Sequence, residues 1–218
     1  MVSQAEENYL KALFHLTSEI QNKTEAGTNE LAEVLDVTPA TANNMLKKLK
    51  EKDLVSYEKY GKITLTQKGR SVAVQTVRKH RLWETFLYEK LNFTWDEVHE
   101  VAEQLEHIQS AKLVEQLEKF LDYPAIDPHG DPIPGAKGEI KFVKRKTLAE
   151  REIAHTCKLI AVKDNSSSFL QYIVRLGLGL TSKIKIVNRQ ELDGSLEIEV
   201  DKVRSSISKK VAQNLFVV

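Results

Sequence analysis

The sequence is poor in cysteine and contains no long apolar run. Its single cysteine, Cys157, excludes an intramolecular disulfide bond and a zinc site built from several thiolates. No stretch approaches the roughly 18 to 20 apolar residues of a transmembrane helix, and the first residues, MVSQAEENYL, lack the basic-then-apolar pattern of a secretory signal. We therefore expect a cytoplasmic protein in which Cys157, within the apolar segment TCKLIAV, is a buried strand residue.

Several catalytic motifs are also missing. The sequence contains no glycine-rich phosphate loop and no Gly-x-Ser-x-Gly nucleophile motif. The segment that begins His99-Glu100 has Glu103 where the zinc-protease motif His-Glu-x-x-His requires its second histidine. Paired Glu-x-x-His units for a carboxylate-bridged di-iron bundle are absent as well. These absences argue against an enzyme, although a metalloenzyme that uses carboxylates and histidines stays open as an alternative class.

Charge is distributed unevenly along the chain, although the formal net charge is only +1. Residues 47–81 contain eleven lysines or arginines and three acidic residues, a balance of +8. Residues 82–135 contain twelve acidic residues and three lysines, a balance of −9. A basic segment suits contacts with DNA phosphates, and an acidic segment suits the binding of cations.

The N-terminal part has the spacing of a helix-turn-helix. Ser3-Gln-Ala-Glu6 predicts a capping box at the start of a helix that extends to about residue 20. A short helix is expected to end at Leu35, and after a tight turn a longer one is expected to extend to about Lys52, with Thr38 as its N-cap and Pro39 in its first position. A short helix, a tight turn and a longer helix are typical of DNA-binding proteins.

A β-hairpin is predicted directly after these helices. Residues 54–58 and 62–66 alternate between apolar and polar around the turn Lys59-Tyr60-Gly61, which indicates a wing. The polar and basic side chains of the third helix and the wing are therefore candidates for contacts with bases and phosphates. The candidates are Thr38, Pro39, Thr41, Asn43, Asn44, Lys47, Lys48, Lys59 and Lys62.

The next two expected helices concentrate histidine and glutamate. One spans about residues 70–91, and the other follows a second capping box that begins at Thr94. Together they carry six potential metal ligands within 28 positions, a density that favours a metal site over simple helix-stabilising pairs. At about 100° per residue, the four on the second helix, His99 to His107, fall within about 100° of arc on one helix face. The six are His80, Glu84, His99, Glu103, Glu106 and His107.

The rest of the chain changes from helix to strand. A helix over about 110–121 has an apolar stripe larger than a lone domain of this size needs, which favours a dimer interface over an internal core. A segment rich in proline and glycine, residues 127–135, is expected to form an extended linker. After residue 148 the pattern predicts a small barrel-like domain, with strands near 156–162, 183–188, 195–200 and 215–218 and a helix near 167–176.

This order of parts resembles the diphtheria-toxin-repressor or manganese-transport-regulator family of metal-dependent bacterial transcriptional repressors. The resemblance covers nearly the whole chain, and its most specific stretches are RKHRLWE at 78–84, HEVAEQLEH at 99–107 and HGDPIPG at 129–135. It implies a mostly helical protein with β structure. The expected parts are a winged helix-turn-helix domain (1–72), a helical metal-binding and dimerisation domain (73–126), a linker (127–147) and a C-terminal SH3-like domain similar to ferrous iron transport A (148–218).

The resemblance also implies two metal sites. The regulatory site maps to Asn8, Glu103, Glu106 and His107. The second site maps to His80, Glu84 and His99, or alternatively combines Glu84 with Asp127, His129 and Asp164. Glu103 occupies a position that is cysteine in the iron-sensing branch and glutamate in the manganese-sensing branch.

Oxygen donors favour Mn(II) or Fe(II), so Mn(II) is the expected activator, Fe(II) the alternative, and Zn(II) a further candidate at the second site. Two residues depart from the manganese branch, which usually has aspartate where this chain has Asn8, and in some members a ligand glutamate where it has Lys11. A two-metal arrangement bridged through position 11 is therefore not expected.

The resulting hypothesis is a homodimer that binds double-stranded operator DNA with an inverted repeat and controls metal-uptake genes. It requires neither an organic cofactor nor a membrane. An iron-dependent regulator of the same fold is one alternative. A winged-helix regulator that senses an organic ligand would not need the histidine and glutamate array, so the metal content of the purified protein separates it from the main hypothesis.

Overall fold

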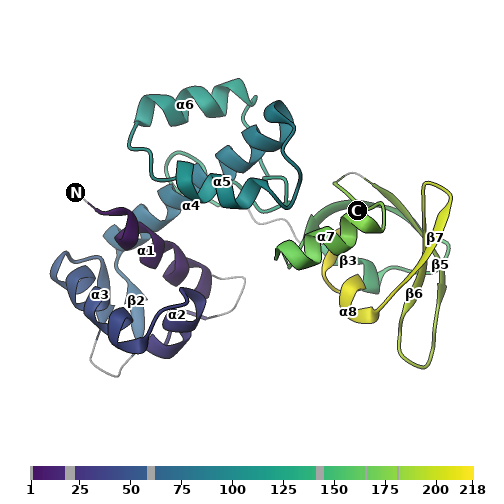
Figure 1. Cartoon of the computed structure of the whole chain (residues 1–218), viewed down its shortest axis with the longest axis horizontal. Helices are drawn as coiled ribbons and strands as arrows, with labels where there is room; N and C mark the ends of the chain where they lie inside the picture. The colour runs from purple at the N-terminus through teal and green to yellow at the C-terminus, as the bar shows by residue number, and fades with distance from the viewer. Residues whose placement is uncertain (1, 18–22, 58–61, 141–144, 165, 181) are drawn as a thin grey trace. The chain divides into compact units, whose positions relative to one another are not determined.

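The chain forms two compact units in the computed structural model shown in Figure 1. The long helix α4 (Gln67–Leu91) passes from one unit to the other between His80 and Arg81. The first unit comprises Met1–His80, Leu105–Gln109 and Pro134–Glu139, and the second comprises Arg81–Gln104, Ser110–Ile133 and Ile140–Val218. The structure describes residues 2–17, 23–57, 62–140, 145–164, 166–180 and 182–218.

Three short helices build the N-terminal part of the first unit: α1 (Gln4–Leu16), α2 (Thr28–Val34) and α3 (Pro39–Glu51). The predicted capping box at Ser3 is confirmed, since its side chain accepts a hydrogen bond from the Glu6 backbone and Glu6 bonds back to the Ser3 amide. Thr38 caps α3 as expected. Helix α1 ends at Leu16, whereas the sequence predicted about residue 20, and residues 18–22 lie outside the described part.

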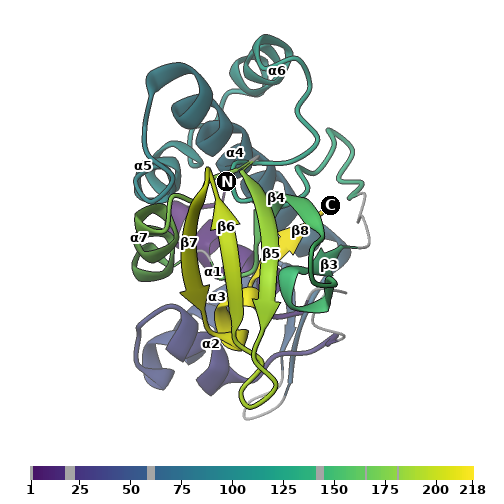
Figure 2. The ribbon, with the colours of Figure 1, turned by 90° about the vertical axis from the view of Figure 1, so that its right-hand side faces the viewer.

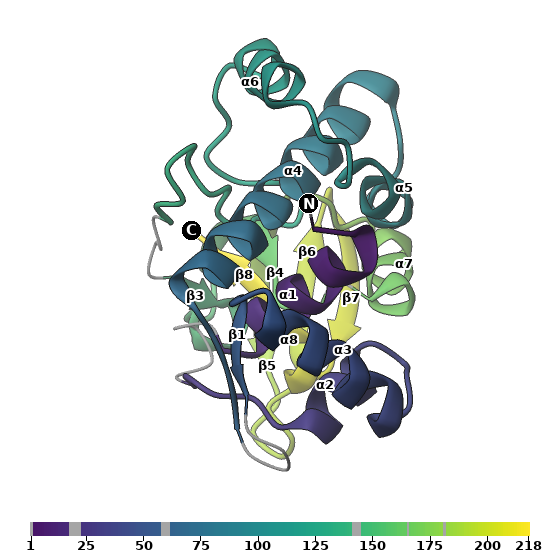
Figure 3. The same ribbon diagram turned by 90° about the vertical axis from the view of Figure 1, so that its left-hand side faces the viewer.

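The wing follows α3, as predicted. Strands β1 (Val55–Tyr57) and β2 (Ile63–Leu65) pair antiparallel with Val55 opposite Leu65, and they lie side by side in Figure 3. The predicted turn at 59–61, which includes Lys59, lies outside the described residues. At the start of α4, a side chain at Gly69 would place its Cβ 1.9 Å from the Leu54 carbonyl oxygen, so only glycine permits this close approach.

In the second unit, α6 (Ala111–Phe120) contributes to a small helical core. Leu117 and Leu121 are buried with Leu82 of α4 and Ile133 of the linker. Phe120 of the same helix is 64% exposed, and Leu113 is also exposed. The apolar stripe predicted for this helix is therefore divided between an internal core and an exposed face.

Helix α5 (Val98–Leu105) is shorter than predicted. The Thr94 amide donates a hydrogen bond to Glu97 Oε2, which is one half of the predicted capping box. The other half does not form, because the Glu97 amide bonds to the Thr94 carbonyl and the Thr94 hydroxyl bonds to Asp96. The expectation that one helix carries all four ligands through His107 is wrong, because α5 ends at Leu105 and the chain continues in a turn in which the Ile108 amide bonds to the Leu105 carbonyl. Glu106 and His107 consequently leave the helical stripe that His99 and Glu103 share.

The C-terminal part of the second unit is a six-stranded antiparallel sheet in the order β3-β8-β4-β5-β6-β7, seen in Figure 2. Its core contains Cys157, which is 3% exposed, as predicted. The four predicted strands are present, whereas β3, β7 and α8 were not predicted. The elements are β3 (Lys146–Thr147), η2 (Leu148–Glu150), β4 (Thr156–Val162), α7 (Ser167–Arg175), β5 (Lys183–Arg189), β6 (Leu196–Val200), β7 (Val203–Ile207), α8 (Lys209–Ala212) and β8 (Leu215–Val217).

Helix α4, with 25 residues, is long enough to cross a bilayer, but its charged residues make it unsuitable. None of the helices in the described ranges combines the length and the apolar character of a membrane span.

Candidate metal centres

The first unit gathers a group of polar and charged side chains, several of them of metal-ligating type, here called the first cluster. It draws on three segments that are far apart in the sequence, namely α1, the middle of α4 and the turn after α5. Two of the four residues predicted for the regulatory site, Glu106 and His107, come from the turn, and a third, Asn8, comes from α1. The first cluster consists of Glu7, Asn8, Lys11, His80, Glu106 and His107.

Glu106 is the most deeply buried carboxylate of this cluster, with no exposed surface. The Lys11 Nζ atom lies 2.8 Å from both of its oxygens, and His80 Nδ1 lies 2.6 Å from Oε2. Such pairing is expected, because a buried carboxylate without a compensating charge or hydrogen bond is costly. Lys11 and His80 therefore supply the polar partners that the buried Glu106 side chain needs.

His107 is oriented by a residue that the sequence did not single out. Its Nδ1 lies 2.6 Å from Glu7 Oε2, and its Nε2 lies 3.7 Å from Glu106 Oε1. Glu7 Oε1 also accepts a hydrogen bond of 2.7 Å from Gln109. When Nδ1 donates to a carboxylate, Nε2 is left as the ligating nitrogen, an arrangement common around metal-bound histidine. The sequence feature that could have indicated this role is the acidic residue at position 7, next to Asn8 in the first turn of α1.

Asn8 fits the role of an additional donor. Its Oδ1 is buried and has no hydrogen-bond partner among the described residues. Buried polar atoms normally have a partner, so this oxygen has the capacity to bind a cation. An amide oxygen, a carboxylate and an imidazole, the groups of Asn8, Glu106 and His107, are donor types that Mn(II) and Fe(II) accept.

The second unit contains another group, here called the second cluster: Glu84 of α4, His99 of α5, and Asp127 and His129 of the linker. Glu84, Asp127 and His129 are all buried, and one ligand atom from each lies within 4.8 Å of the others. Glu84 is central, with Oε1 3.1 Å from His99 Nδ1 and Oε2 3.4 Å from His129 Nδ1. The structure thus brings together residues from both of the predicted versions of the second site.

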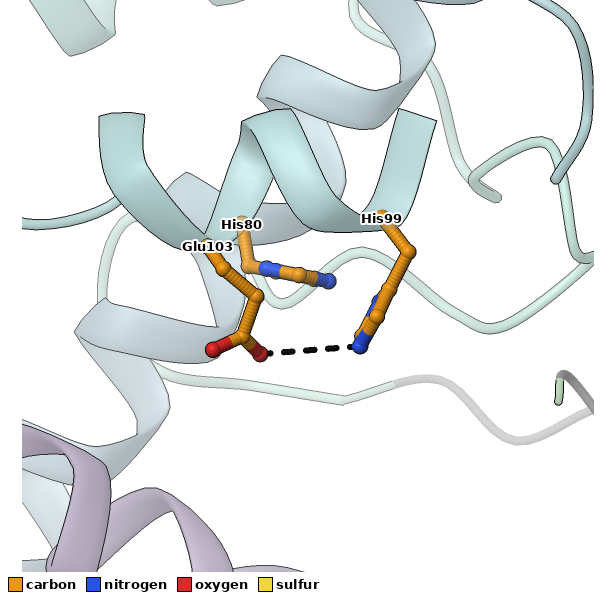
Figure 4. Close-up of side chains that lie close together, drawn as sticks. All are labelled: His80, His99 and Glu103. Atoms are coloured by element: carbon orange, nitrogen blue, oxygen red, sulfur yellow. Dashed lines mark ion pairs between the residues drawn. The ribbon is translucent and has the colours of Figure 1, made fainter. Parts of the chain in front are cut away.

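The remaining predicted ligands lie elsewhere or make other contacts. Glu103 Oε1 lies 3.6 Å from His99 Nε2, one turn away on α5, as Figure 4 shows. Asp164 accepts a hydrogen bond from the Ser166 amide just before α7 and is not part of the second cluster. His80, also drawn in Figure 4, belongs to the first unit, where its partner is Glu106.

The linker reaches the second cluster through a close approach to β4. Gly130 has φ +87°, and a Cβ there would lie 2.3 Å from the Ile160 carbonyl oxygen. The Val162 amide bonds to the His129 carbonyl at 3.0 Å, and His129 Nε2 lies 3.2 Å from the Trp95 carbonyl. The histidine is therefore positioned by the C-terminal sheet as well as by the helices of this unit.

The two linker residues of the second cluster have shifted pKa values. Burial raises the pKa of Asp127 to about 7, assisted by the negative charges of Glu84 and Asp131 and opposed by Arg81. Burial alone would lower the pKa of His129, but its hydrogen bond with Glu84 and the nearby carboxylates outweigh this effect and raise it. Both groups therefore tend to retain protons that a metal ion would displace.

The candidate DNA contacts lie on α3 and the wing. Exposed residues of α3 include Asn44, Lys47 and Lys48. Asn43 is more constrained, because its amide nitrogen bonds to the Pro39 carbonyl at 2.9 Å and its oxygen accepts from the Tyr57 hydroxyl. Within the described residues, the remaining candidates are exposed: Thr38, which caps α3, Pro39, Thr41, and Lys62, which pairs with Glu25.

Comparison with known protein families matches three consecutive parts of the chain. Residues 1–63 match the iron dependent repressor, N-terminal DNA binding domain. Residues 66–135 match the iron dependent repressor, metal binding and dimerisation domain, and residues 146–218 match the FeoA domain. These matches confirm the expected fold class, with a C-terminal SH3-like domain.

Individual relatives agree with these matches. The iron-dependent repressor IdeR of Mycobacterium tuberculosis is 33% identical over 129 residues, which are 59% of this chain and 55% of that protein. The chain thus spans about half the length of the curated relatives it matches. A manganese-dependent transcriptional repressor solved in complex with manganese is 34% identical, with a TM-score of 0.80 over 98% of this chain and 99% of that one.

A second solved structure, of ScaR with bound Cd2+, is also 34% identical, with a TM-score of 0.74 over 98% of both chains. The three consecutive domain matches and the likeness over the whole length lead to one conclusion. The chain belongs to the family of iron- and manganese-dependent transcriptional repressors.

Proposed function

We propose that the chain is a transcriptional repressor that binds an inverted-repeat operator as a homodimer when it is loaded with Mn(II), and thereby controls metal-uptake genes. The observation that carries this proposal is the first cluster, in which Glu7 and Lys11 of α1 contact His107 and Glu106, in the unit that contains the helix-turn-helix. The family consists of repressors, so the metalloenzyme alternative is not retained.

The proposed regulatory ligands are Asn8, Glu103, Glu106 and His107. For the second site we propose Glu84, Asp127 and His129, with His99 beside Glu84 Oε1. Mn(II) is favoured over softer ions because oxygen donors predominate in both sets, and Fe(II) is the alternative. The proposed domain division keeps the four parts 1–72, 73–126, 127–147 and 148–218.

The mechanism follows from the placement of the α1 residues. Glu7 orients His107, and Asn8 and Lys11 place a neutral oxygen and an ammonium group on the same helix. A bound divalent cation would supply positive charge to be shared by donors of α1 and of the turn after α5. Asn8 would then hold α1, and with it the helix-turn-helix, in one arrangement and shift the population toward it.

A single arrangement matters because a two-fold dimer recognises an inverted repeat only when its two recognition helices match half-sites about 34 Å apart or a multiple of that distance. We propose α3 as the recognition helix. For the dimer contact we propose the exposed face of α6, where Leu113 and Phe120 are accessible. The family match that includes a dimerisation domain over residues 66–135 supports this assignment.

An operator-binding titration with each metal ion tests the proposal. DNA fragments from the region upstream of the gene that encodes this protein serve as the operator. Fe(II) is titrated under anaerobic conditions. We expect Mn(II) to activate binding, and we expect Asn8→Asp to strengthen the response, because it adds a negative charge to the donor set. Glu100→Gln, an exposed change on α5, serves as the control. Activation by Fe(II) with Mn(II) silent at saturation would assign the chain to iron, and no response to any ion would refute the proposal.

A further inference from the structure

Lys11 contacts both oxygens of Glu106, the carboxylate at the centre of the first cluster. Its Nζ lies 2.8 Å from each Glu106 oxygen, and its side chain is only 12% exposed. His80 Nδ1 approaches Oε2 of the same carboxylate at 2.6 Å. Lys11 thus lies against both Glu106 oxygens, of which Oε2 also faces His80 and Oε1 has no hydrogen-bond partner among the described residues.

An ammonium group and a metal ion compete for the oxygens of one carboxylate. Both are cations that need the oxygen lone pairs, and two cations beside one buried carboxylate repel each other strongly where water is scarce. A protonated amine has no lone pair, so Lys11 cannot join the donor set in this state. A metal ion that binds Glu106 must therefore displace Lys11 from at least one of the two oxygens.

We propose that Lys11 is a tethered internal cation that competes with the metal ion for Glu106 and so sets the metal concentration at which the regulatory site fills. This inference rests on the proposed function of the first cluster. Lys11 lies on α1, three residues after Asn8 and four after Glu7. The same helix therefore carries the competitor, the donor oxygen and the carboxylate that orients His107.

A second consequence concerns the number of ions. After a metal ion displaces Lys11, the ammonium group remains close to the cluster, because the lysine side chain is attached to α1. A second cation in the same cluster would be repelled by this ammonium group as well as by the first ion. Lys11 thus limits the first cluster to one ion.

The test measures Mn(II) affinity without DNA, in the full-length protein, by competition with a chromophoric chelator. Lys11→Met keeps the length and apolar character of the side chain and removes its charge. We expect about tenfold tighter Mn(II) binding, because the variant removes a competing charge beside the buried Glu106 carboxylate. Equal or weaker binding by this variant would overturn the proposal.

Lys52→Met is the matched control. Lys52 also pairs with a glutamate of α1, with its Nζ 2.7 Å from Glu6 Oε1, but Glu6 is not a proposed ligand. We expect this variant to keep the wild-type affinity. Comparable tightening in both variants would show that net charge alone is responsible, and would also overturn the proposal.

Lys11→Arg covers the case in which the methionine variant does not fold. Arginine retains the charge and pairs with carboxylates through two hydrogen bonds, so we expect it to bind Mn(II) no more tightly than the wild type does. Tighter binding would contradict the competition. Failure of the proposed function has a different signature, because the wild-type protein and Glu106→Gln would then bind Mn(II) equally.

Discussion

In the first cluster the buried carboxylate of Glu106 is balanced by the Lys11 ammonium group, whereas in the second cluster burial raises the pKa of Asp127 to about 7, so a proton balances that carboxylate. Arg81 contributes less, with its Nε 3.4 Å from Asp127 Oδ2. Both clusters keep carboxyl groups inside the protein, as a cation site requires. They differ in what a metal ion has to displace.

This difference separates two kinds of metal response. Displacing a lysine moves a side chain of α1, the helix that leads into the helix-turn-helix, so filling the first cluster is coupled to the DNA-binding part. Displacing protons from Asp127 and His129 makes metal binding depend on pH. We therefore expect the first cluster to regulate and the second to support.

The largest expected effect distinguishes the two clusters directly. Glu106→Gln should reduce metal-stimulated operator binding by at least about 100-fold, and Glu84→Gln by about 10-fold, since supporting residues of metal sites typically contribute 10- to 100-fold. Gel-shift titrations with Mn(II) measure both, with dimerisation checked by sedimentation. A loss for Glu84→Gln that equals or exceeds that for Glu106→Gln would reverse the assignment of roles.

The next prediction concerns the metal-free protein and pH. Between about pH 4 and pH 7 the folded chain keeps a proton on Asp127 that the unfolded chain has released, so stability falls as pH rises. The raised pKa of His129 acts in the same direction, since its stabilising contribution is lost as pH rises through its folded-state pKa.

Asp127→Asn should remove the contribution of Asp127, so that the free energy of unfolding falls less steeply as pH rises. Near pH 7.5 the variant should be more stable than the wild type by up to a few kcal/mol. Urea unfolding of the metal-free protein between pH 5 and pH 8 measures the slope. Asp122→Asn, at an exposed position, is the matched control. An unchanged slope in Asp127→Asn would mean that Asp127 is already ionised in the folded protein.

The smallest expected effect concerns the salt dependence of DNA binding, which should change without any change in metal binding. Lys47→Gln and Lys48→Gln should each reduce the slope of log K for DNA against log salt by about 0.9, the value for one neutralised phosphate. The affinity for Mn(II) should not change, because both lysines are exposed on α3, outside both clusters. A wild-type slope near zero would be incompatible with the proposed phosphate contacts.

Much of the local structure was predictable because it depends on short-range patterns. The capping box at Ser3, the proline that starts α3, the strand alternation of the wing and the apolar strands of the C-terminal sheet all formed as expected. Strand β7 (Val203–Ile207) was missed, because its largely exposed residues VRSSI have no apolar alternation. It forms by pairing along the edge of β6.

For the candidate metal centres, the sequence by itself determined which residue types are present: histidines and glutamates concentrated at 80–107, and a linker with Asp127 and His129. Only the tertiary structure decided how they group. Helix periodicity placed Glu106 and His107 on one face with His99 and Glu103, but α5 ends at Leu105, and their side chains contact α1 instead. The partnerships of Lys11 with Glu106 and of Glu7 with His107 join residues about a hundred positions apart, and no periodic pattern encodes a contact between such distant segments.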